Sequence, residues 1–349
     1  MKRWRLLLLL LPLVVGALYL RSLASWRPQK VFVGAGPISQ LLFSNDGKTL
    51  LVGHSPIVTV LSSTQASTPT LVTLLDVNNS FKPLWQRDKG LPSGLIPQFF
   101  AADSKILLHG SDIQTLDAKT GRTLKTSGSL YGRAVMSPDG SWLAVNRSDT
   151  DDGRVYLNPQ PLEQGHDEVR AEKIIGNKGD LSTEFTFSPD GKTFVVGTGS
   201  WQGAHLDFYD VKTWKRTKSW NDTPRNPKDE KPRSYYEILQ WSRDGKFILS
   251  YWSCTEGGAM LTLWRVSDGK KLATSPTIDL SPELQDGGSV LSYSDKERVF
   301  LRKVPNLTSG GEELLHIANE LITTVTLSPD GSYLVIGTTS GRVFWKRVK

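Results

Sequence analysis

Cysteine is nearly absent from this chain, and so is any concentrated run of charge of one sign. The 349 residues contain one cysteine, Cys254, which excludes an intramolecular disulfide and a cysteine-based metal site. A large apolar core makes disulfides unnecessary even in an exported protein. The formal net charge is +7, and the lysines and arginines are scattered along the chain with no long cationic run. Because nucleic-acid binding needs a concentrated basic footprint, we expect no nucleic-acid partner.

The motifs of several enzyme classes are also missing. The sequence has no Gly-x-Ser-x-Gly nucleophile elbow and no glycine-rich phosphate loop that leads into a helix. Residues 149–153 resemble a calcium loop but lack its alternating oxygen ligands and final Glu. No pair of histidines has helical metal-ligand spacing; the five are His54, His109, His166, His205 and His316. The sequence therefore predicts no catalytic residue, no metal ligand and no cofactor.

The longest apolar run lies at the N-terminus. Residues 6–20 carry no charge and follow a basic start at residues 1–5. This run is short for a helix that must cross about 30 Å of hydrocarbon, and the small residues at 22–24 suit a cleavage site. Residues 1–25 are therefore predicted to form a hydrophobic helix that is either a signal peptide or a single transmembrane anchor. The basic flank predicts that the rest of the chain lies outside the cytoplasm, membrane-anchored, or secreted or periplasmic after cleavage.

One short motif recurs along the rest of the chain. Its clearest copy is Phe187–Gly191, Phe-Ser-Pro-Asp-Gly, which stands between two β-rich runs. Pro presets a negative φ, Asp bonds back to the backbone, and Gly takes the left-handed conformation, so the motif predicts a hairpin turn. Related copies begin at Phe43, Met136, Trp241 and Leu327, and a degenerate copy begins at Phe100. Recurrence at roughly 40–50 residues predicts an architecture built blade by blade.

The two ends of the repeat array predict how it closes. Val31–Val33 is an extra strand before the first blade, and the last blade ends at Val343–Lys346 one strand short. An array of four-stranded blades must close between its chain ends, so we expect the N-terminal strand to complete the seventh blade. Blade six is the least regular, and residues 281–287 are either its stretched turn or a loop before it. Residues 26–349 are thus predicted to form one propeller domain.

These turns, together with third-strand endings such as Leu206–Lys212 and Leu263–Lys270, resemble those of WD-repeat and related seven-bladed β-propellers. The likeness is nearer to bacterial periplasmic propellers with TolB-like or YVTN-type repeats. The Gly-His pair of the WD family is absent, and its Trp-Asp ending is Trp264-Arg265 in blade five. The resemblance covers nearly the whole chain after residue 29. It implies an all-β fold, a seven-bladed β-propeller.

The resemblance also implies where a site would lie. In propellers, the loops between second and third strands and those between blades share one face, opposite the Ser-Pro-Asp-Gly turns. Large aromatics at such a rim can anchor a partner, although each can instead pack between adjacent blades. The candidate partner-binding rim consists of Trp201, His205, Trp252 and Glu256.

Three functions are compatible with this sequence. The leading hypothesis is a membrane-anchored or exported scaffold that binds a protein or peptide through its loop face. The alternatives are an enzyme of the lactonase or lyase type and a receptor for a small ligand, each with a site at the central channel. Fold alone does not separate them, because propellers host many functions. The oligomeric state stays open.

Overall fold

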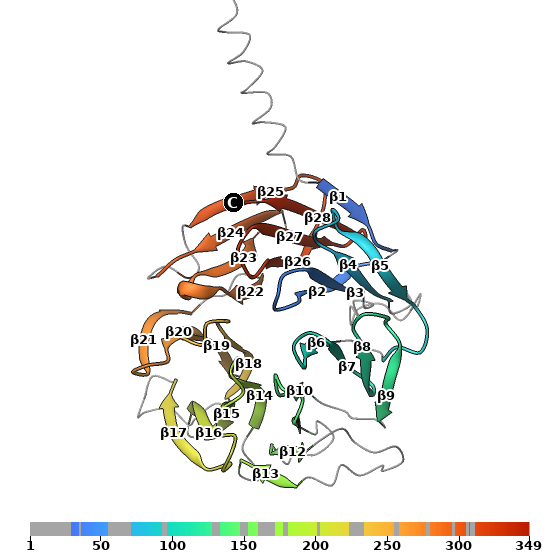
Figure 1. The fold of residues 1–349 in the computed structure, drawn as a ribbon. Coiled ribbons are helices and arrows are strands. Elements are labelled where there is room, and N and C mark those ends of the chain that lie inside the picture. Colours follow the sequence, from blue (N-terminus) through green and yellow to red (C-terminus); the bar gives the residue numbers. More distant parts are fainter. Residues whose placement is uncertain are drawn as a thin grey trace, which may run out of the picture.

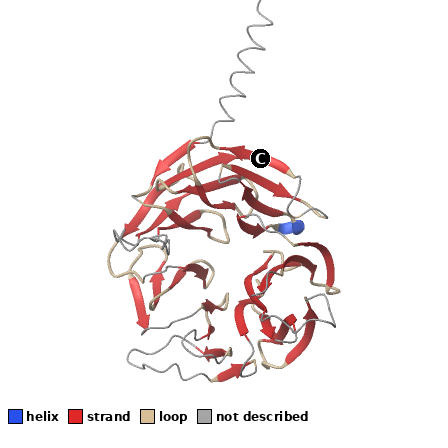
Figure 2. Ribbon diagram, turned by 180° about the vertical axis from the view of Figure 1, so that it is seen from behind, coloured by secondary structure: helices blue, strands red, loops and turns tan. Residues whose placement is uncertain are grey.

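The strands of this protein form a closed ring of seven blades. The structure, a computed structural model, describes residues 29–34, 36–54, 71–92, 96–127, 133–146, 153–159, 172–176, 181–200, 203–222, 234–254, 258–276, 280–294, 297–304, 307 and 311–348. Strands β1 to β28 make seven four-stranded sheets around a central axis (Figure 1). Within these ranges the helical structure is one short 3₁₀ turn, Asp286–Gly288 (Figure 2). The predicted all-β seven-bladed β-propeller is confirmed.

Each sheet extends outward from an inner strand beside the axis. The inner strands are β2 (Ile38–Phe43), β6 (Ile96–Phe100), β10 (Ala134–Met136), β14 (Leu181–Phe187), β18 (Ser234–Trp241), β22 (Leu280–Leu284) and β26 (Ile322–Leu327). The second strands are β3 (Thr49–His54), β7 (Lys105–His109), β11 (Trp142–Asn146), β15 (Thr193–Ser200), β19 (Phe247–Cys254), β23 (Val290–Ser294) and β27 (Tyr333–Thr338). The third strands are β4 (Leu71–Asp76), β8 (Ile113–Asp117), β12 (Val155–Pro159), β16 (Gly203–Asp210), β20 (Ala259–Arg265), β24 (Arg298–Arg302) and β28 (Arg342–Arg347). The outer strands are β5 (Lys82–Arg87), β9 (Thr123–Ser127), β13 (Lys173–Ile175), β17 (Arg216–Asn221), β21 (Lys270–Ser275), β25 (Glu312–His316) and, in blade seven, β1 (Gln29–Phe32).

The ring closes in blade seven, where the two ends of the chain share one sheet. β1 pairs antiparallel with β28, with Val31 opposite Val343. Just beyond β1, Val33 is buried and its amide donates to the carbonyl of Gly341 at 3.3 Å. The predicted closure by the N-terminal strand is confirmed, and it covers an edge of β28 that could otherwise pair with another chain.

Blade six has a complete sheet in spite of its irregular sequence. Leu280–Leu284 is its inner strand, and the chain then turns through Asp286–Gly288 before entering β23. The region left open by the sequence thus contains both the inner strand and the stretched turn. Asp286 also joins this turn to blade five, since its Oδ1 accepts the Asp244 amide at 2.8 Å.

The hydrophobic helix predicted for residues 1–25 lies outside the described residues. In the ranges that the structure does describe, no helix has the length and apolarity needed to cross a membrane. The described chain begins with β1, at the outer edge of blade seven.

The Ser-x-Asp-Gly turns interlock from blade to blade on one face of the ring. Ser188 Oγ donates to Asp190 Oδ1 at 2.6 Å, and this hydrogen bond is the main reason why the pKa of Asp190 is lowered. The ring of Pro138, in blade three, lies against Gly191 of the next turn. The same Ser-to-Asp hydrogen bond occurs at Ser44–Asp46, Ser137–Asp139, Ser242–Asp244 and Ser328–Asp330. The motif therefore fixes both the local turn and the register between blades.

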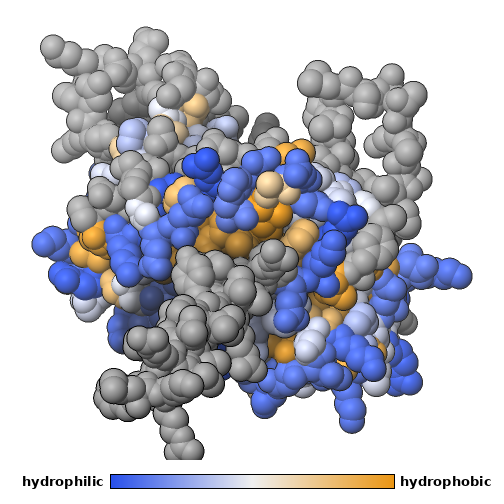
Figure 3. All heavy atoms as spheres, turned by 90° about the horizontal axis from the view of Figure 1, so that it is seen from above, coloured by the Kyte–Doolittle hydropathy of each residue, from blue (hydrophilic) through white to orange (hydrophobic). Residues whose placement is uncertain are grey.

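The core fills the spaces between neighbouring blades. One cluster joins Val195 and Phe208 of blade four to Leu239 and Trp264 of blade five. On the edge of the ring seen in Figure 3, hydrophilic side chains cover much of the described surface, with apolar atoms visible between them. Burial of apolar faces between sheets, worth roughly 25 cal/mol per Å², is thus the main force that holds the blades together.

Candidate functional site

The structure describes two of the four predicted rim residues. Trp201 and Glu256 lie outside the described residues. Trp252, on β19, is only 6% exposed and packs with Leu206 and Tyr236 between blades four and five. Burying this large ring stabilises the interface between the blades. Trp252 therefore offers no exposed ring to a partner, which corrects the expectation for this residue.

His205 belongs to an ion-pair group on β16. Its Nε2 lies 3.3 Å from Oδ2 of Asp207, and Nη1 of Arg216 lies 3.5 Å from Oδ1. Burial alone would raise the pKa of Asp207, but hydrogen bonds from His205 and Ser219 outweigh it, so the pKa is lowered. Because β16 is the third strand of its blade, this group lies away from the central axis. Its geometry indicates a role in holding the outer strands of blade four together.

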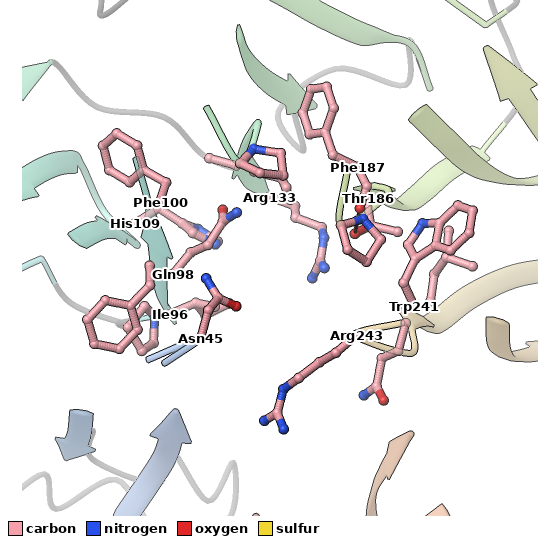
Figure 4. A pocket seen from close by; sticks show the side chains of 18 residues that line it. Asn45, Ile96, Gln98, Phe100, His109, Arg133, Thr186, Phe187, Trp241 and Arg243 are labelled. Carbon is pink, nitrogen blue, oxygen red and sulfur yellow. Dashed lines mark hydrogen bonds between the residues drawn. The ribbon is translucent and has the colours of Figure 1, made fainter. Parts of the chain in front are cut away.

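A cavity of about 440 Å³ occupies the central channel and defines a different candidate site. Its wall is formed by β6, β10, β14 and β18 and by residues of the Ser-x-Asp-Gly turns. Figure 4 shows its 18 lining residues. Two of them, Arg133 and Arg243, are basic, and the described lining contains no Asp or Glu. The largest apolar lining side chains are Ile96, Phe99, Phe100, Phe187, Leu239 and Trp241. We call this space the central cavity.

Arg133 reaches the central cavity from the residue before β10. Its Nη1 lies 3.1 Å from Oε2 of Glu184 on β14. Burial raises the pKa of Glu184 to about 7, although the charge of Arg133 acts to lower it. The buried Nε of Arg133 has no hydrogen-bond partner among the described residues. Arg133 therefore retains an unused donor beside the cavity.

Replacing Glu184 with glutamine is expected to change how stability depends on pH. The folded-state pKa of about 7 lies above the usual value near 4.3, so the folded protein binds an extra proton between these values. The free energy of unfolding of the wild type therefore falls as pH rises from about 5 to 8. Glu184→Gln removes this contribution. The free energy of unfolding of the variant minus that of the wild type should therefore be about 1–3 kcal/mol larger at pH 8 than at pH 5.

Urea denaturation of both proteins at pH 5 and pH 8 measures this difference. A second buried group, His109, has its pKa lowered to about 4 by burial and by the charge of Arg133, and its contribution is lost as pH falls from about 6.5 toward 4. It is present in both proteins, so the difference between them isolates Glu184. Parallel pH profiles for the two proteins would contradict a buried, proton-binding Glu184.

Arg243 enters the central cavity from the turn after β18. It stands where other copies of the turn have proline, and its Nη2 donates across to the carbonyl of Leu327 at 3.3 Å. Glu283 of blade six is partly buried near it, and burial raises the pKa of Glu283 despite hydrogen bonds from Gln285 and Thr326 and the charge of Arg243. Arg243 is thus held at the cavity by neighbours from two other blades.

Two glutamines fasten the inner strands to one another around the cavity. The amide of Gln98 donates to the carbonyl of Met136 at 2.7 Å and accepts its N–H at 2.8 Å. Gln240 does the same to blade six, donating to the carbonyl of Pro282 at 3.0 Å and accepting the Leu284 amide at 3.0 Å. These paired bonds fix the spacing of the inner strands. The wall of the cavity is therefore built before any ligand arrives.

A second polar group, centred on the fully buried Asp222, joins blades four and five. Asp222, just after β17, accepts hydrogen bonds from Ser250 Oγ at 2.7 Å, Thr262 Oγ1 at 2.8 Å and Tyr236 OH at 3.2 Å. Lys271 Nζ lies 3.4 Å from its Oδ1 and donates to its carbonyl at 2.8 Å. Both carboxylate oxygens are used within the protein, so this group is structural.

Metal-ligating side chains do not converge in the described parts of the chain, where no group of three His, Cys, Asp or Glu could hold an ion. Cys254 is partly buried on β19, and its Sγ accepts the Gly258 amide at 3.0 Å.

Comparisons with known proteins agree with the fold. No protein-family model and no curated protein matches this sequence. Among solved structures, the chain is similar to the β-propeller domain of Cps50 (Swd1) from Myceliophteria thermophila, a WD40 propeller. The two share 12% sequence identity with a TM-score of 0.62, over 92% of this chain and 100% of that one. At this identity the likeness shows the fold, and the TolB-like or YVTN-type subtype stays a prediction.

Proposed function

We propose that this propeller is a noncatalytic interaction module that binds a protein or peptide partner at its central cavity. The observation that carries the proposal is the cavity wall, which combines apolar side chains with two arginines on a frame fixed by interstrand hydrogen bonds. A concave, mostly apolar surface with a few placed polar groups is typical of binding sites. Arginine and aromatic residues are also enriched among the side chains that dominate protein interfaces.

The enzymatic alternative needs an acid and a base at the cavity. The described lining holds one histidine, His109, whose pKa is lowered to about 4, so it is neutral at pH 7. Glu184, whose pKa of about 7 would suit an acid or base, is paired with Arg133 behind the lining, and the described lining holds no second titratable group to act with it at pH 7. This lining favours binding over lactonase- or lyase-type chemistry.

Selection from a random peptide library tests the proposed function. The full chain, in mild detergent and immobilised through its C-terminus, is panned against displayed peptides. We expect a reproducible set of peptides that compete with one another and bind with dissociation constants in the micromolar range. The matched control is the same protein denatured and blocked. Enrichment that is equal on the folded and denatured proteins would overturn the proposal.

We further propose that residues 1–25 carry the propeller out of the cytoplasm, as an uncleaved anchor or a cleaved signal. Two features support this: the basic and then apolar sequence of the segment, and the position of β1 at the outer edge of blade seven. β1 lies at the rim of the ring and not at an opening of the channel (Figure 1). The TolB-like or YVTN-type subtype proposed from the sequence fits the same location.

Carbonate extraction of membranes, combined with N-terminal sequencing, distinguishes the two forms. An anchor leaves the intact chain in the membrane pellet, whereas cleavage gives a soluble protein whose first residue follows Ala24. Recovery of the intact chain in the soluble cytoplasmic fraction would overturn the proposed location.

A further inference from the structure

We propose that the central cavity takes an acidic peptide segment, whose carboxylates bind Arg133 and Arg243. This inference rests on the proposed function and specifies the chemistry of the partner. It follows from the charge of the lining and from the positions of the two arginines along the channel.

The charge of the cavity has one sign. Arg133 and Arg243 line it, and no acidic side chain of the described residues does so. Glu184 and Glu283 lie behind the lining, where they contact or face the two arginines. In Figure 4 the guanidinium groups point into the same open space. A ligand that brings carboxylates gains charge-assisted hydrogen bonds there, and arginine binds carboxylates in a planar, two-point geometry.

The two arginines enter near opposite ends of the channel. Arg133 precedes the first residue of its inner strand, whereas Arg243 follows the last residue of its own. All inner strands run from the loop face to the turn face, so the two side chains come from different ends of the wall. An inner strand of five residues, such as β6, spans roughly 16 Å. An extended peptide of about five residues, with an acid near each end, matches this separation.

Unused donors and apolar side chains complete the match to a peptide. The Nε of Arg133 and the Nε1 of Trp241 are buried and have no hydrogen-bond partner among the described residues. Both residues belong to the lining, and a side-chain rotation that turns these two groups toward the cavity would let backbone carbonyls of a bound segment accept from them. Ile96, which lines the cavity and is 39% exposed, provides apolar contact for the segment.

Fluorescence anisotropy with labelled peptides tests this inference on the full chain. The probe is a seven-residue peptide with glutamates near both ends and aliphatic residues between them; the comparison peptides carry glutamine or lysine at the same positions. We expect the glutamate peptide to bind at least tenfold more tightly than the glutamine peptide. Added salt should weaken its binding, because screening acts on the partly exposed arginines.

Substitution of the arginines locates the binding. Arg243→Gln should weaken binding of the glutamate peptide by about 10- to 100-fold, and Arg243→Lys should recover part of that loss. Arg133→Gln is made together with Glu184→Gln, so that no buried carboxylate loses its partner. Arg298→Gln, an exposed arginine on β24 away from the cavity, is the matched control and should leave affinity unchanged. Circular dichroism confirms that each variant is folded.

The outcomes separate this inference from the proposed function. If library peptides bind but are not acidic, or if their affinity does not respond to Arg243→Gln, the acidic-peptide inference is wrong and the interaction module stands. Tighter binding of a polyanion such as single-stranded DNA than of the glutamate peptide would also overturn it. If no peptide binds at all, the proposed function fails.

Discussion

Replacing Asp222 with alanine is expected to lower the free energy of unfolding by about 3–5 kcal/mol. The carboxylate is fully buried and accepts from three hydroxyl groups, those of Tyr236, Ser250 and Thr262. Its removal leaves these donors without their acceptor and the ammonium of Lys271 without its carboxylate. A buried donor left unpaired costs far more than the intact interaction contributes, and the three hydroxyl groups supply most of the loss because the Lys271 side chain is 35% exposed.

Two further substitutions show which part of the Asp222 side chain accounts for the lost free energy of unfolding. Asp222→Asn keeps an acceptor but removes the charge, so it should cost roughly half as much as alanine. Asp88→Ala changes an exposed aspartate and should stay within about 0.5 kcal/mol of the wild type. Urea denaturation followed by tryptophan fluorescence measures all three. A cost below about 1 kcal/mol for Asp222→Ala would show that the network contributes little to holding blades four and five together.

The turns and the closure of the ring were predictable because their chemistry is local. A Ser-Pro-Asp-Gly sequence specifies its own backbone geometry, and the structure adds only that Pro138 also packs on the next turn at Gly191. The orphan strand at Val31–Val33 and the incomplete last blade needed no knowledge of distant contacts, because only one pairing satisfies both. Blade six resisted prediction because its turn, Asp286–Gly288, uses two adjacent glycines with φ of 79° and 78° in place of the motif.

The central cavity was harder to predict because its residues converge only in the closed ring. Arg133 and Arg243 are 110 positions apart in the sequence, and nothing in the sequence alone indicates that they meet at one cavity. One signal was available: Arg243 replaces the proline of the motif, as does Asn45, and both line the cavity. The two turn positions that lack the proline of the motif therefore indicated the central cavity, whereas the large aromatic residues of the loops did not.

Asp222 is a buried residue whose surroundings in the sequence suggest exposure. The polar, charged and proline-containing sequence from Asn221 to Ser234 predicts a solvated loop. In the structure, Asn221 ends β17, Ser234 begins β18 and Asp222 is fully buried; residues 223–233 lie outside the described ranges. A charged side chain at the start of such a segment is predicted to be exposed unless its partners are known. Those partners lie on three other strands, β18, β19 and β20, and on β21 for Lys271.

Replacing Gly341 with alanine is expected to weaken the closure of the ring and to lower the free energy of unfolding by about 3–5 kcal/mol. Gly341 has φ of +76°, and an added Cβ would overlap the carbonyl oxygen of Gly34, just after β1. Two costs therefore add: the left-handed conformation of a residue with a side chain, and displacement of the chain that completes blade seven. Because Val33 donates to the Gly341 carbonyl, hydrogen exchange at the Val33 amide should accelerate in the variant.

Gly287 provides a matched control that separates these two costs. Its φ of +79° is nearly the same, but an added Cβ would meet nothing within 4 Å. Gly287→Ala should therefore cost only the conformational strain, about 1–2 kcal/mol, with no change in exchange at Val33. The difference between the two variants measures the contact across the closure. If the variants are equally stable and exchange at Val33 is unchanged in both, then the packing of Gly341 on Gly34 does not hold β1 in blade seven, and the closure depends on the pairing of β1 with β28 alone.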